Sequence, residues 1–290
     1  MSRRTIRILD TTLRDGALTP GVRFSSEARE EIALALERAG VEVIEAGFPA
    51  RAEDEAVGVA RVASVLSRAM ACALCRASPA EIERAAALLG GRRGRIHVFA
   101  GGVGSRASEV IPKVEQAIAL ARASAHEVQF TPLDASRLER AYLLELASAA
   151  AQAGATLVSV SDTLGAALPE DVAEMVGAVR ARVDATISFH GHDDLGLATA
   201  CSLAAIAAGA TQVEVCVNGL GPRAGNTALE QLAAALALHG ARWDCESALD
   251  LAALRPLSAL VARHAGVSVA PSRPIVGAQA GPGSLEALIG

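Results

Sequence analysis

The feature that most constrains the fold is an alternation of short β-branched segments with longer segments rich in Ala, Leu, Glu and Arg. It continues almost to the end of the 290-residue chain. The short segments are typical of buried strands, and the longer ones carry apolar residues at helical spacing. Eight consecutive strand–helix units match a closed (β/α)8 TIM barrel, which usually has about 250 residues. We therefore predict strands at residues 5–10, 41–48, 69–74, 95–100, 127–132, 156–162, 186–192 and 212–219.

The helical pattern is clear in residues 25–40, where Ile32, Leu36 and Ala39 fall on one stripe. Glycines mark the expected ends of four helices, at Gly40, Gly90, Gly154 and Gly209. The alternative fold is an open doubly wound sheet, which usually has a GxGxxG turn after its first strand. The first strand here is followed by DTTLRDG instead, so the barrel is favoured.

A short extension is expected after the barrel. We assign residues 1–245 to the barrel and 246–290 to a C-terminal helix with a Pro- and Gly-containing tail. An amphipathic helix at 247–265 should precede a poorly ordered arm that starts at Val267. The apolar face of this helix should pack on a second copy of the chain or on the outer helices of the barrel itself. Its residues are Leu251, Leu254, Leu257, Leu260 and Val261.

Composition excludes several classes of protein. Hydrophobic residues make up 51% of the chain, which supplies a large aliphatic core and argues against disorder. The net charge of −5 arises from mixed acids and bases without a basic block, so no nucleic acid partner is expected. No apolar run reaches the roughly 18 residues of a membrane span, and no apolar signal core follows the N-terminus. We expect a soluble, cytoplasmic protein.

The five cysteines form an odd, scattered set in a chain large enough to fold without covalent links, so disulfides are not expected. Cys72 and Cys75 form a CxxC pair, but a zinc ribbon needs a second pair. This pair is therefore interpreted as part of a packed strand end.

Functional residues of such barrels lie where the strands end and the following loops begin. Acids, histidines, hydroxyl and amide residues and an arginine occupy these positions here. They are Asp10, Arg14, Asp15, Glu45, His97, Thr131, Asp162, Thr163, His190, His192, Asn218 and Asn226.

The histidines suggest a metal site. Alternate residues of a strand face the same way, so His190 and His192 project together. Asp15 follows the first strand, which in a closed barrel is separated from the seventh only by the eighth, and Asn226 follows the eighth. Mixed nitrogen and oxygen ligands of this kind suit a divalent Mg, Mn, Zn, Co or Fe ion with open positions for substrate oxygens.

Six phrases in order resemble the metal-dependent barrel superfamily of 2-isopropylmalate synthase, homocitrate synthase and HMG-CoA lyase. The resemblance spans about residues 5 to 240. Within it, IEAGFPA, DASR (134–137) and RAGN are most similar to homocitrate synthase. The six phrases are DTTLRDG (10–16), TPG (19–21), IEAGFPA (44–50), SDTLG (161–165), HGHDDLGLA (190–198) and NGLGPRAGN (218–226).

The resemblance implies a role for each candidate residue. The implied metal ligands are Asp15, His190, His192 and Asn226. Arg14 would stabilise an oxyanion or enolate, while Glu45 and Asp162 would position substrate or move protons. Glu45 and Asp162 could equally pair with Arg14 in the barrel mouth. The implied substrate-binding residues are His97, Thr131 and Thr163.

The chain also departs from the synthase pattern. A glutamate and a glutamine are replaced by Ala17 and Leu18, and acids are replaced by Leu133 and Pro222. After PIVG (274–277), the HESGIH-like phrase of the synthases is not found, and no histidine follows His264. A condensation of acetyl-CoA needs a base for the thioester methyl group, and its usual sources are therefore missing.

Three functions are consistent with these observations. The first is an acyltransferase resembling homocitrate synthase that condenses acetyl-CoA with a 2-oxo acid, in a homodimer like related synthases. The second is an aldolase or lyase that cleaves a 2-hydroxy acid or hydroxyacyl-CoA, which Asp193 after the histidine pair fits. The third is a catalytically impaired paralogue with a binding or regulatory role.

Overall fold

A computed structural model describes residues 3–90 and 94–280. Eight parallel strands form a closed barrel in sequence order, and the last strand pairs with the first, Val215 beside Asp10. The predicted barrel is confirmed. The strands are β2 (Arg7–Asp10), β3 (Val43–Gly47), β4 (Met70–Arg76), β5 (Gly94–Ala100), β6 (Glu127–Pro132), β7 (Leu157–Asp162), β8 (Thr186–Gly191) and β9 (Gln212–Val215).

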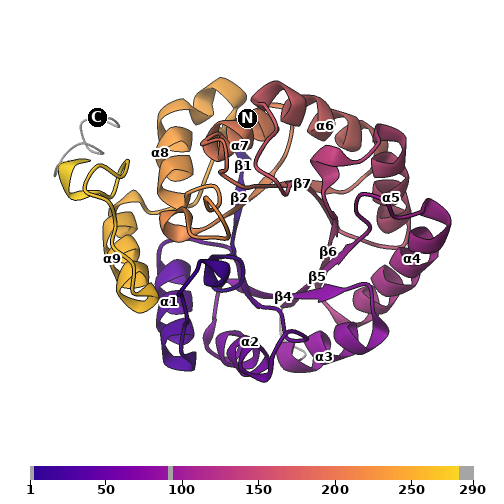
Figure 1. Ribbon diagram of the computed structural model, residues 1–290, viewed down its shortest axis with the longest axis horizontal. Helices are drawn as coiled ribbons and strands as arrows, with labels where there is room; N and C mark the ends of the chain where they lie inside the picture. Colours follow the sequence, from indigo (N-terminus) through magenta and orange to yellow (C-terminus); the bar gives the residue numbers. More distant parts are fainter. Residues whose placement is uncertain (1–2, 91–93, 281–290) are drawn as a thin grey trace.

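Helices form a ring outside the strands, as seen along the barrel in Figure 1. The ring contains α1 (Ser26–Arg38), α2 (Glu53–Val65), α3 (Pro79–Leu89), α4 (Ala107–Ser124), α5 (Arg140–Gln152), α6 (Pro169–Arg182), α7 (Ala198–Ala207) and α8 (Leu229–His239). Helix α1 shows why the sequence sets these bounds. The hydroxyl of Ser25 accepts a hydrogen bond from the amide of Ala28, which satisfies a free donor of the first turn. Gly40 follows the helix at φ +91°, where a Cβ would collide with the carbonyl oxygen of Ala248.

The main core lies between the strands and the helices, where the predicted stripe of Ile32, Leu36 and Ala39 is fully buried. The barrel interior is different. It holds a small apolar cluster of Leu9, Val43, Met70 and Cys72, and beside this cluster its side chains are polar. Arg95 is fully buried and donates from Nη1 to the side-chain oxygens of Gln129 and Gln212, each at 2.8 Å. Buried polar groups are stable only when they are bonded in this way.

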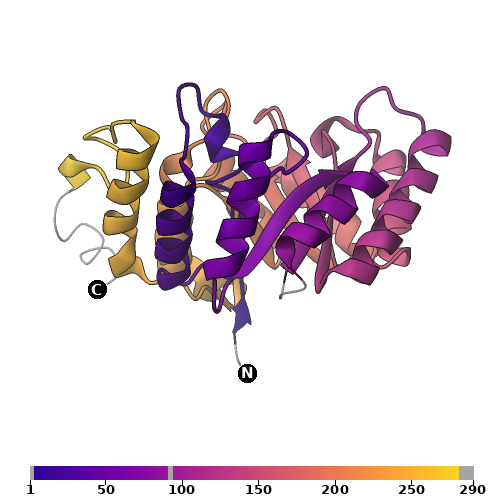
Figure 2. The ribbon, with the colours of Figure 1, turned by 90° about the horizontal axis from the view of Figure 1, so that it is seen from below.

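Most strand bounds differ from prediction by one or two residues, and two differences are larger. The eighth predicted strand, 212–219, ends at Val215, because Val217–Gly219 form a 3₁₀ turn in which Asn218 has φ +59°. A two-stranded parallel sheet of β1 (Arg4–Thr5) and β10 (Cys245–Glu246) was not predicted, since two residues are too few to show a period. Figure 2 shows β1 at the end of the barrel opposite the βα loops. The proposed domain boundary after residue 245 falls inside β10.

Helix α9 (Leu254–Ala265) lies outside the ring beside α1 (Figure 1). Leu254, Leu257 and Val261 are buried in the same core as the apolar face of α1. The helix was expected to pack on a second copy of the chain or on the outer helices of the barrel. In the structure it packs on the outer helices. The homodimer stays a prediction without support from this face. The last part of the expected arm, 281–290, lies outside the described residues.

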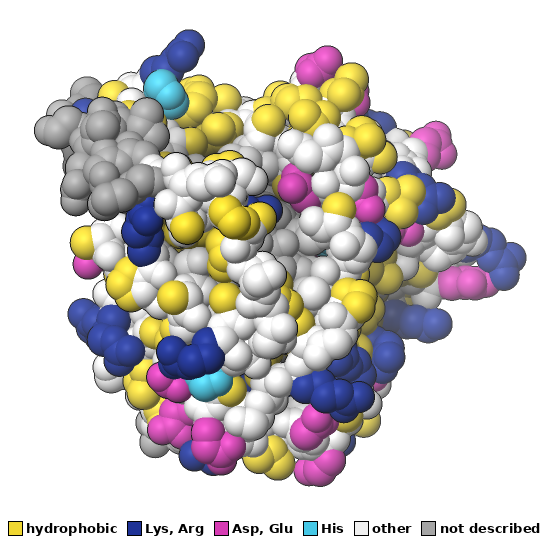
Figure 3. Space-filling view, turned by 60° about the vertical axis from the view of Figure 1, so that its left-hand side comes forward, with side chains coloured by type: hydrophobic (Ala, Val, Ile, Leu, Met, Phe, Trp, Pro, Cys, Tyr) yellow, Lys and Arg dark blue, Asp and Glu magenta, His cyan; other side chains and the backbone are white. Residues whose placement is uncertain are grey.

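All five cysteines are buried free thiols. On the face that carries α9, acidic and basic side chains are interspersed and neither sign forms a continuous band (Figure 3). Within the ranges that the structure describes, no helix has both the length and the apolar character needed to cross a bilayer.

Asp10, one of the strand-end residues, is buried away from solvent at the end of β2. The amide and hydroxyl of Thr12 donate to its two oxygens at 2.9 and 3.0 Å. Burial, reinforced by the negative charges of Glu230 and Glu45, raises the pKa of Asp10 to about 7 despite these bonds. Ionisation of Asp10 therefore destabilises the folded state, by an amount that depends on pH.

We expect Asp10→Asn to change the free energy of unfolding differently at two pH values. Its effect at pH 8 should be more stabilising than its effect at pH 4.5, by roughly 2 kcal/mol. The folded state binds the extra proton between the usual pKa of 3.8 and the raised one near 7, so wild-type stability falls as pH rises through this window. Asparagine keeps one of the two acceptors, for the backbone amide of Thr12, and does not ionise. Urea unfolding at both pH values measures the effect, and an unchanged pH dependence in the variant would contradict it.

Candidate active site at the barrel mouth

A cavity of about 460 Å³ opens at the carboxyl ends of the strands. We group its lining residues by chemistry and call the polar set the floor, the apolar set the wall, and two further arginines the rim; the floor includes seven of the predicted residues. The floor contains Arg14, Asp15, His97, Thr131, Ser161, Thr163, His190, His192 and Glu214; the wall contains Leu18, Phe48, Leu74, Phe99, Leu133 and Pro222; the rim contains Arg51 and Arg223.

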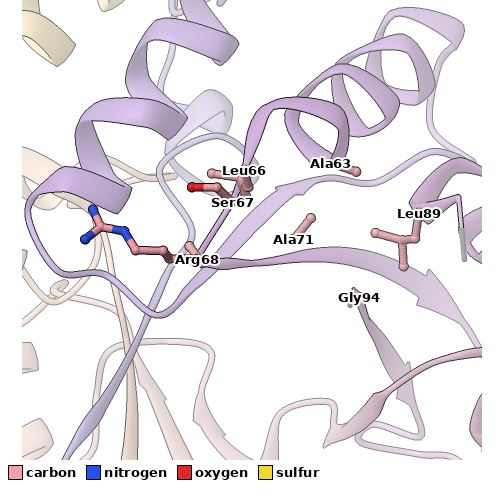
Figure 4. Close-up of a pocket in the computed structure, with 8 residues that line it drawn as sticks. Ala63, Leu66, Ser67, Arg68, Ala71, Leu89 and Gly94 are labelled. Carbon is pink, nitrogen blue, oxygen red and sulfur yellow. The ribbon is translucent and has the colours of Figure 1, made fainter. Parts of the chain in front are cut away.

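A second cavity, of about 230 Å³, lies between α2, β4 and α3. Its lining is small or apolar apart from Ser67 and Arg68, and Arg68 extends away from the other residues (Figure 4). Because it brings no acids, histidines or cysteines together, the mouth cavity is the better candidate site.

Asp15, His190 and His192 form a buried cluster on the cavity floor. Asp15 Oδ2 lies 3.3 Å from His192 Nε2 and 3.7 Å from His190 Nε2. The two rings are 4.8 Å apart between centroids, as expected for alternate positions at the end of β8. Although burial alone would raise the pKa of Asp15, Arg14 and the two histidines hold it well below its usual range. The cluster is therefore an ionised carboxylate facing two imidazoles.

Groups behind each imidazole orient it. His190 Nδ1 lies 3.1 Å from Glu214 Oε2, at an ion-pair distance without the alignment of a good hydrogen bond. His192 Nδ1 lies 3.3 Å from the backbone carbonyl oxygen of Asp162. Acceptors at Nδ1 favour protonation of that nitrogen and leave Nε2 free to bind a metal. Both Nε2 atoms are the ones that face Asp15.

Asn226 tests whether this cluster fits a metal ion. Its side-chain amide group donates to Asp15 Oδ2 and to the carbonyl oxygen of Leu220, both at 2.9 Å. Its carbonyl oxygen, Oδ1, is buried and has no hydrogen-bond partner. A buried oxygen without a partner is costly unless a hydrogen-bond donor or a cation binds it, and a cation is the partner that the neighbouring ligands would share. Two imidazole nitrogens, a carboxylate and this oxygen therefore fit a divalent ion.

Arg14 lies between two buried carboxylates. Its Nε is 2.6 Å from Glu45 Oε2, and its Nη1 contacts Asp15 Oδ1. Burial favours a raised pKa for Glu45, but Arg14 and His97 lower it to about 2. Arg14 is thus a fixed cation at the cavity floor, placed where negative charge could develop.

Glu45, His97 and Thr131 form a continuous chain from β3 through β5 to β6. His97 Nδ1 lies 2.7 Å from Glu45 Oε1, and His97 Nε2 lies 2.7 Å from the hydroxyl of Thr131. His97 and Thr131 line the cavity, while Glu45 is fully buried behind them.

The structure does not bring the Asp162 carboxylate into this site. Ser161 faces the cavity, so Asp162, the next residue of β7, faces outward. The Ser136 hydroxyl and the Ala167 amide donate to its oxygens at 2.9 and 3.0 Å. The expectation that Asp162 could pair with Arg14 is therefore wrong, whereas Glu45 does pair with Arg14. Thr163, the following residue, reaches the cavity.

Glu214, a buried residue of the cavity floor, was missed by the sequence analysis. Side chains of Gln129, Ser159 and Ser188 donate to its Oε1 at 2.7, 2.5 and 3.2 Å. Burial would raise its pKa, but His190 and these donors hold it below the usual range. The available signal was the alternation of Gln212 and Glu214 in a strand whose other residues are apolar.

The C-terminal segment holds the loop that carries Asn226. Arg273 donates to the carbonyl oxygen of Asn218 at 2.9 Å, and the Asn218 amide side chain donates to the carbonyl oxygen of Ser258 on α9 at 3.0 Å. The next carbonyl oxygen, of Gly219, accepts from the Asn226 backbone amide at 3.1 Å. Sequence analysis assigned no such role to this segment.

Three departures from the synthase pattern meet at one place. Leu18, Leu133 and Pro222 all line the mouth cavity, together with Phe48 and Phe99, whose rings are 5.8 Å apart. Polar groups expected from the resemblance are thus replaced by one apolar wall.

The profile of the HMGL-like family matches residues 5–261. The chain belongs to the HMGL-like family. It is 40% identical over 286 residues to 2-isopropylmalate synthase of Nitrosococcus oceani, covering 94% of this chain and 56% of that protein. It is 38% identical over 293 residues to 2-isopropylmalate synthase 1 of Caldanaerobacter subterraneus, covering 97% and 74%. The HMGL-like chain thus spans little more than half the length of some curated relatives.

Solved structures support the fold of this HMGL-like protein. An HMG-CoA lyase from Acinetobacter baumannii, in complex with coenzyme A and 3-methylmalate, superposes with a TM-score of 0.78 at 18% identity. The match covers 92% of this chain and 93% of that one. The predicted superfamily is confirmed, while the finer similarity to homocitrate synthase is not specifically supported.

We expect Glu214→Gln to weaken divalent metal binding by about 10–100-fold, because it removes the charge that orients His190 and keeps its Nε2 free. Glutamine preserves the acceptor for Gln129 and Ser159. Calorimetric titration with Mn²⁺ measures the change, and Glu246→Gln, an exposed site on β10, is the matched control. Equal affinity in the two variants would contradict this role.

Proposed function

We propose that this HMGL-like protein is a metal-dependent enzyme that condenses the acetyl group of acetyl-CoA with a 2-oxo acid. The observation that carries the proposal is the buried cluster of Asp15, His190 and His192, with the unpartnered Asn226 oxygen and Arg14 beside it. The names of the relatives, 2-isopropylmalate synthases, agree with this reaction class.

Asp15, His190, His192 and Asn226 would hold the divalent ion. When bound, that ion supplies a Lewis acid that polarises the carbonyl group of the oxo acid. Thr163 would donate to the substrate carboxylate, and Arg14 would stabilise negative charge on the carbonyl oxygen as the carbon–carbon bond forms. The apolar wall would exclude water from the reacting carbons.

The same wall indicates which oxo acid fits. A second carboxylate, as in 2-oxoglutarate, would be desolvated against Leu18, Leu133 and Pro222. The two arginines of the rim already pair with the carboxylates of Glu55 and Asp194. A branched apolar side chain would bury favourable surface there. We therefore propose 2-oxoisovalerate ahead of 2-oxoglutarate, which places the activity nearer to 2-isopropylmalate synthase than to homocitrate synthase.

Release of free thiol from acetyl-CoA tests the proposal. With Mn²⁺ or Mg²⁺ present, 2-oxoisovalerate should give kcat/KM at least about 10-fold above that of 2-oxoglutarate or pyruvate, since each buried methyl group is worth about 1–3 kcal/mol. No thiol release with any of the three acids would overturn the synthase proposal.

Cleavage of a 2-hydroxy acid is a second candidate. Leu133 and Pro222 in the cavity replace acids of the synthase pattern, and Asp193 follows the histidine pair. Cleavage of 2-isopropylmalate without any turnover of CoA would favour this function. Thiol release with an oxo acid would favour condensation.

A further inference from the structure

A condensation needs a group that removes a proton from the thioester methyl, and the cavity offers few. Among the described residues that line it, Asp15, His190 and His192 form the candidate metal cluster, and Glu214 is enclosed by its own donors. The arginines are cations and cannot accept a proton. His97 is the group that is left with a proton-accepting nitrogen.

The contacts of His97 define which nitrogen accepts. The Glu45 carboxylate, 2.7 Å from Nδ1, can only accept, so Nδ1 carries the hydrogen. Nε2 is then an acceptor for the Thr131 hydroxyl at 2.7 Å. The side-chain amide nitrogen of Gln129, 3.3 Å from the same Nε2, is also a donor. The acceptor at Nδ1 and the Gln129 donor at Nε2 therefore point independently to one tautomer.

The chain Thr131–His97–Glu45 has the arrangement of a hydroxyl, a base and an orienting carboxylate, both links being within reach for proton transfer. A chain of hydrogen bonds with a purely structural role could lie anywhere in the protein interior. This one ends at the cavity surface, because Thr131 lines it while Glu45 is fully buried. The other oxygen of Glu45 binds Arg14 at 2.6 Å, which ties the chain to the cation of the site.

We propose that Thr131 and His97, oriented by Glu45, form the relay that removes the methyl proton of the acyl thioester. This inference rests on the proposed function. The methyl C–H bond breaks, its proton passes to Thr131 Oγ1, and the hydroxyl proton of Thr131 passes to His97 Nε2. The electron pair of the C–H bond moves into the thioester enolate. The enolate carbon attacks C2 of the oxo acid, the new alkoxide takes the proton back from His97 through Thr131, and water then hydrolyses the thioester to release the thiol.

Deuterium exchange isolates the first step. Full-length protein with Mn²⁺ is incubated in D₂O with acetyl-CoA and oxalate, which mimics the chelating end of a 2-oxo acid and cannot condense. Incorporation of deuterium into the acetyl methyl group is followed by mass spectrometry. We expect Thr131→Val and His97→Gln each to slow exchange and to lower kcat by about 10²–10³-fold. Mn²⁺ affinity and melting temperature should stay near the wild-type values in Thr131→Val.

Thr186→Val is the matched control. It makes the same chemical change at the first residue of β8, at the end of the barrel opposite the cavity, and should exchange as the wild type does. If the wild type and Thr131→Val exchange equally fast, the relay is overturned while the proposed condensation stands. If the wild type neither exchanges nor releases thiol with any oxo acid, the proposed condensation is overturned and the relay with it. Loss of exchange in Thr131→Val together with lost Mn²⁺ binding would also overturn the relay, because it would show a structural role.

Discussion

Replacing both His190 and His192 with alanine is expected to abolish binding of about one divalent ion per chain. Their Nε2 atoms, together with Asp15 Oδ2, would be the strongest ligands of the proposed metal site. Without them, Asp15 and Asn226 supply only two oxygens, and we expect the affinity for Mn²⁺ or Zn²⁺ to fall by at least about 10²-fold. Equilibrium dialysis with metal analysis measures the stoichiometry. The barrel should survive, because its core lies outside these residues.

The matched control is the double variant His126→Ala and His239→Ala, since both histidines are exposed and neither lines the cavity. It should bind metal like the wild type. Retention of one ion per chain by the His190 and His192 double variant would rule out the assigned site. Equal loss in both double variants would show adventitious binding to histidines.

Replacing Arg14 with alanine is expected to reduce turnover in either direction by about 10²–10³-fold, because a fixed cation beside the reacting oxygen is lost. Metal binding should remain, since Asp15 keeps its contacts with both histidines. Stability should fall by roughly 3 kcal/mol, because Glu45 loses its ion pair inside the barrel. Steady-state kinetics, Mn²⁺ titration and urea unfolding measure the three effects.

Arg61→Ala is the control for this variant. Arg61 also lies between two carboxylates, Glu27 and Glu30, but on the outer helices where it is exposed. Ion pairs at the surface are screened by water and contribute little, so both stability and turnover should stay near those of the wild type. Full activity in Arg14→Ala would show that the chemistry has been assigned to the wrong residue.

The sequence was most informative where a feature follows from a regular pattern along the chain. The barrel follows from alternating segments, and the neighbouring histidines follow from the two-residue period of β8. Asp15 and Asn226 could be added because the closed topology brings the first, seventh and eighth strands together. These inferences need only the order of strands and the direction of alternate side chains.

Other features depend on contacts that a linear pattern does not contain. Asp162 shares its motif with cavity residues, yet its side chain faces outward because of its parity in β7. Glu214 lies beside His190 because β8 and β9 pair in that register, which the pattern of neither strand contains. The contact of Arg273 with Asn218 joins two loops, and its register cannot be inferred from either one. The choice among synthases depends on packing in the cavity wall.

The short sheet of β1 and β10 bears on how the chain assembles during synthesis. Both this sheet and the pairing of β2 with β9 join the two ends of the barrel sequence. Until β9 has left the ribosome, β2 keeps an unpaired edge that can bind other strands and promote aggregation. Such long-range pairing is also slow, because the loop entropy is lost before the contacts form. A nascent chain that ends before residue 212 has both histidines and Asp15 but no closed ring to hold them together, so the proposed metal site would form only in the final stage of folding.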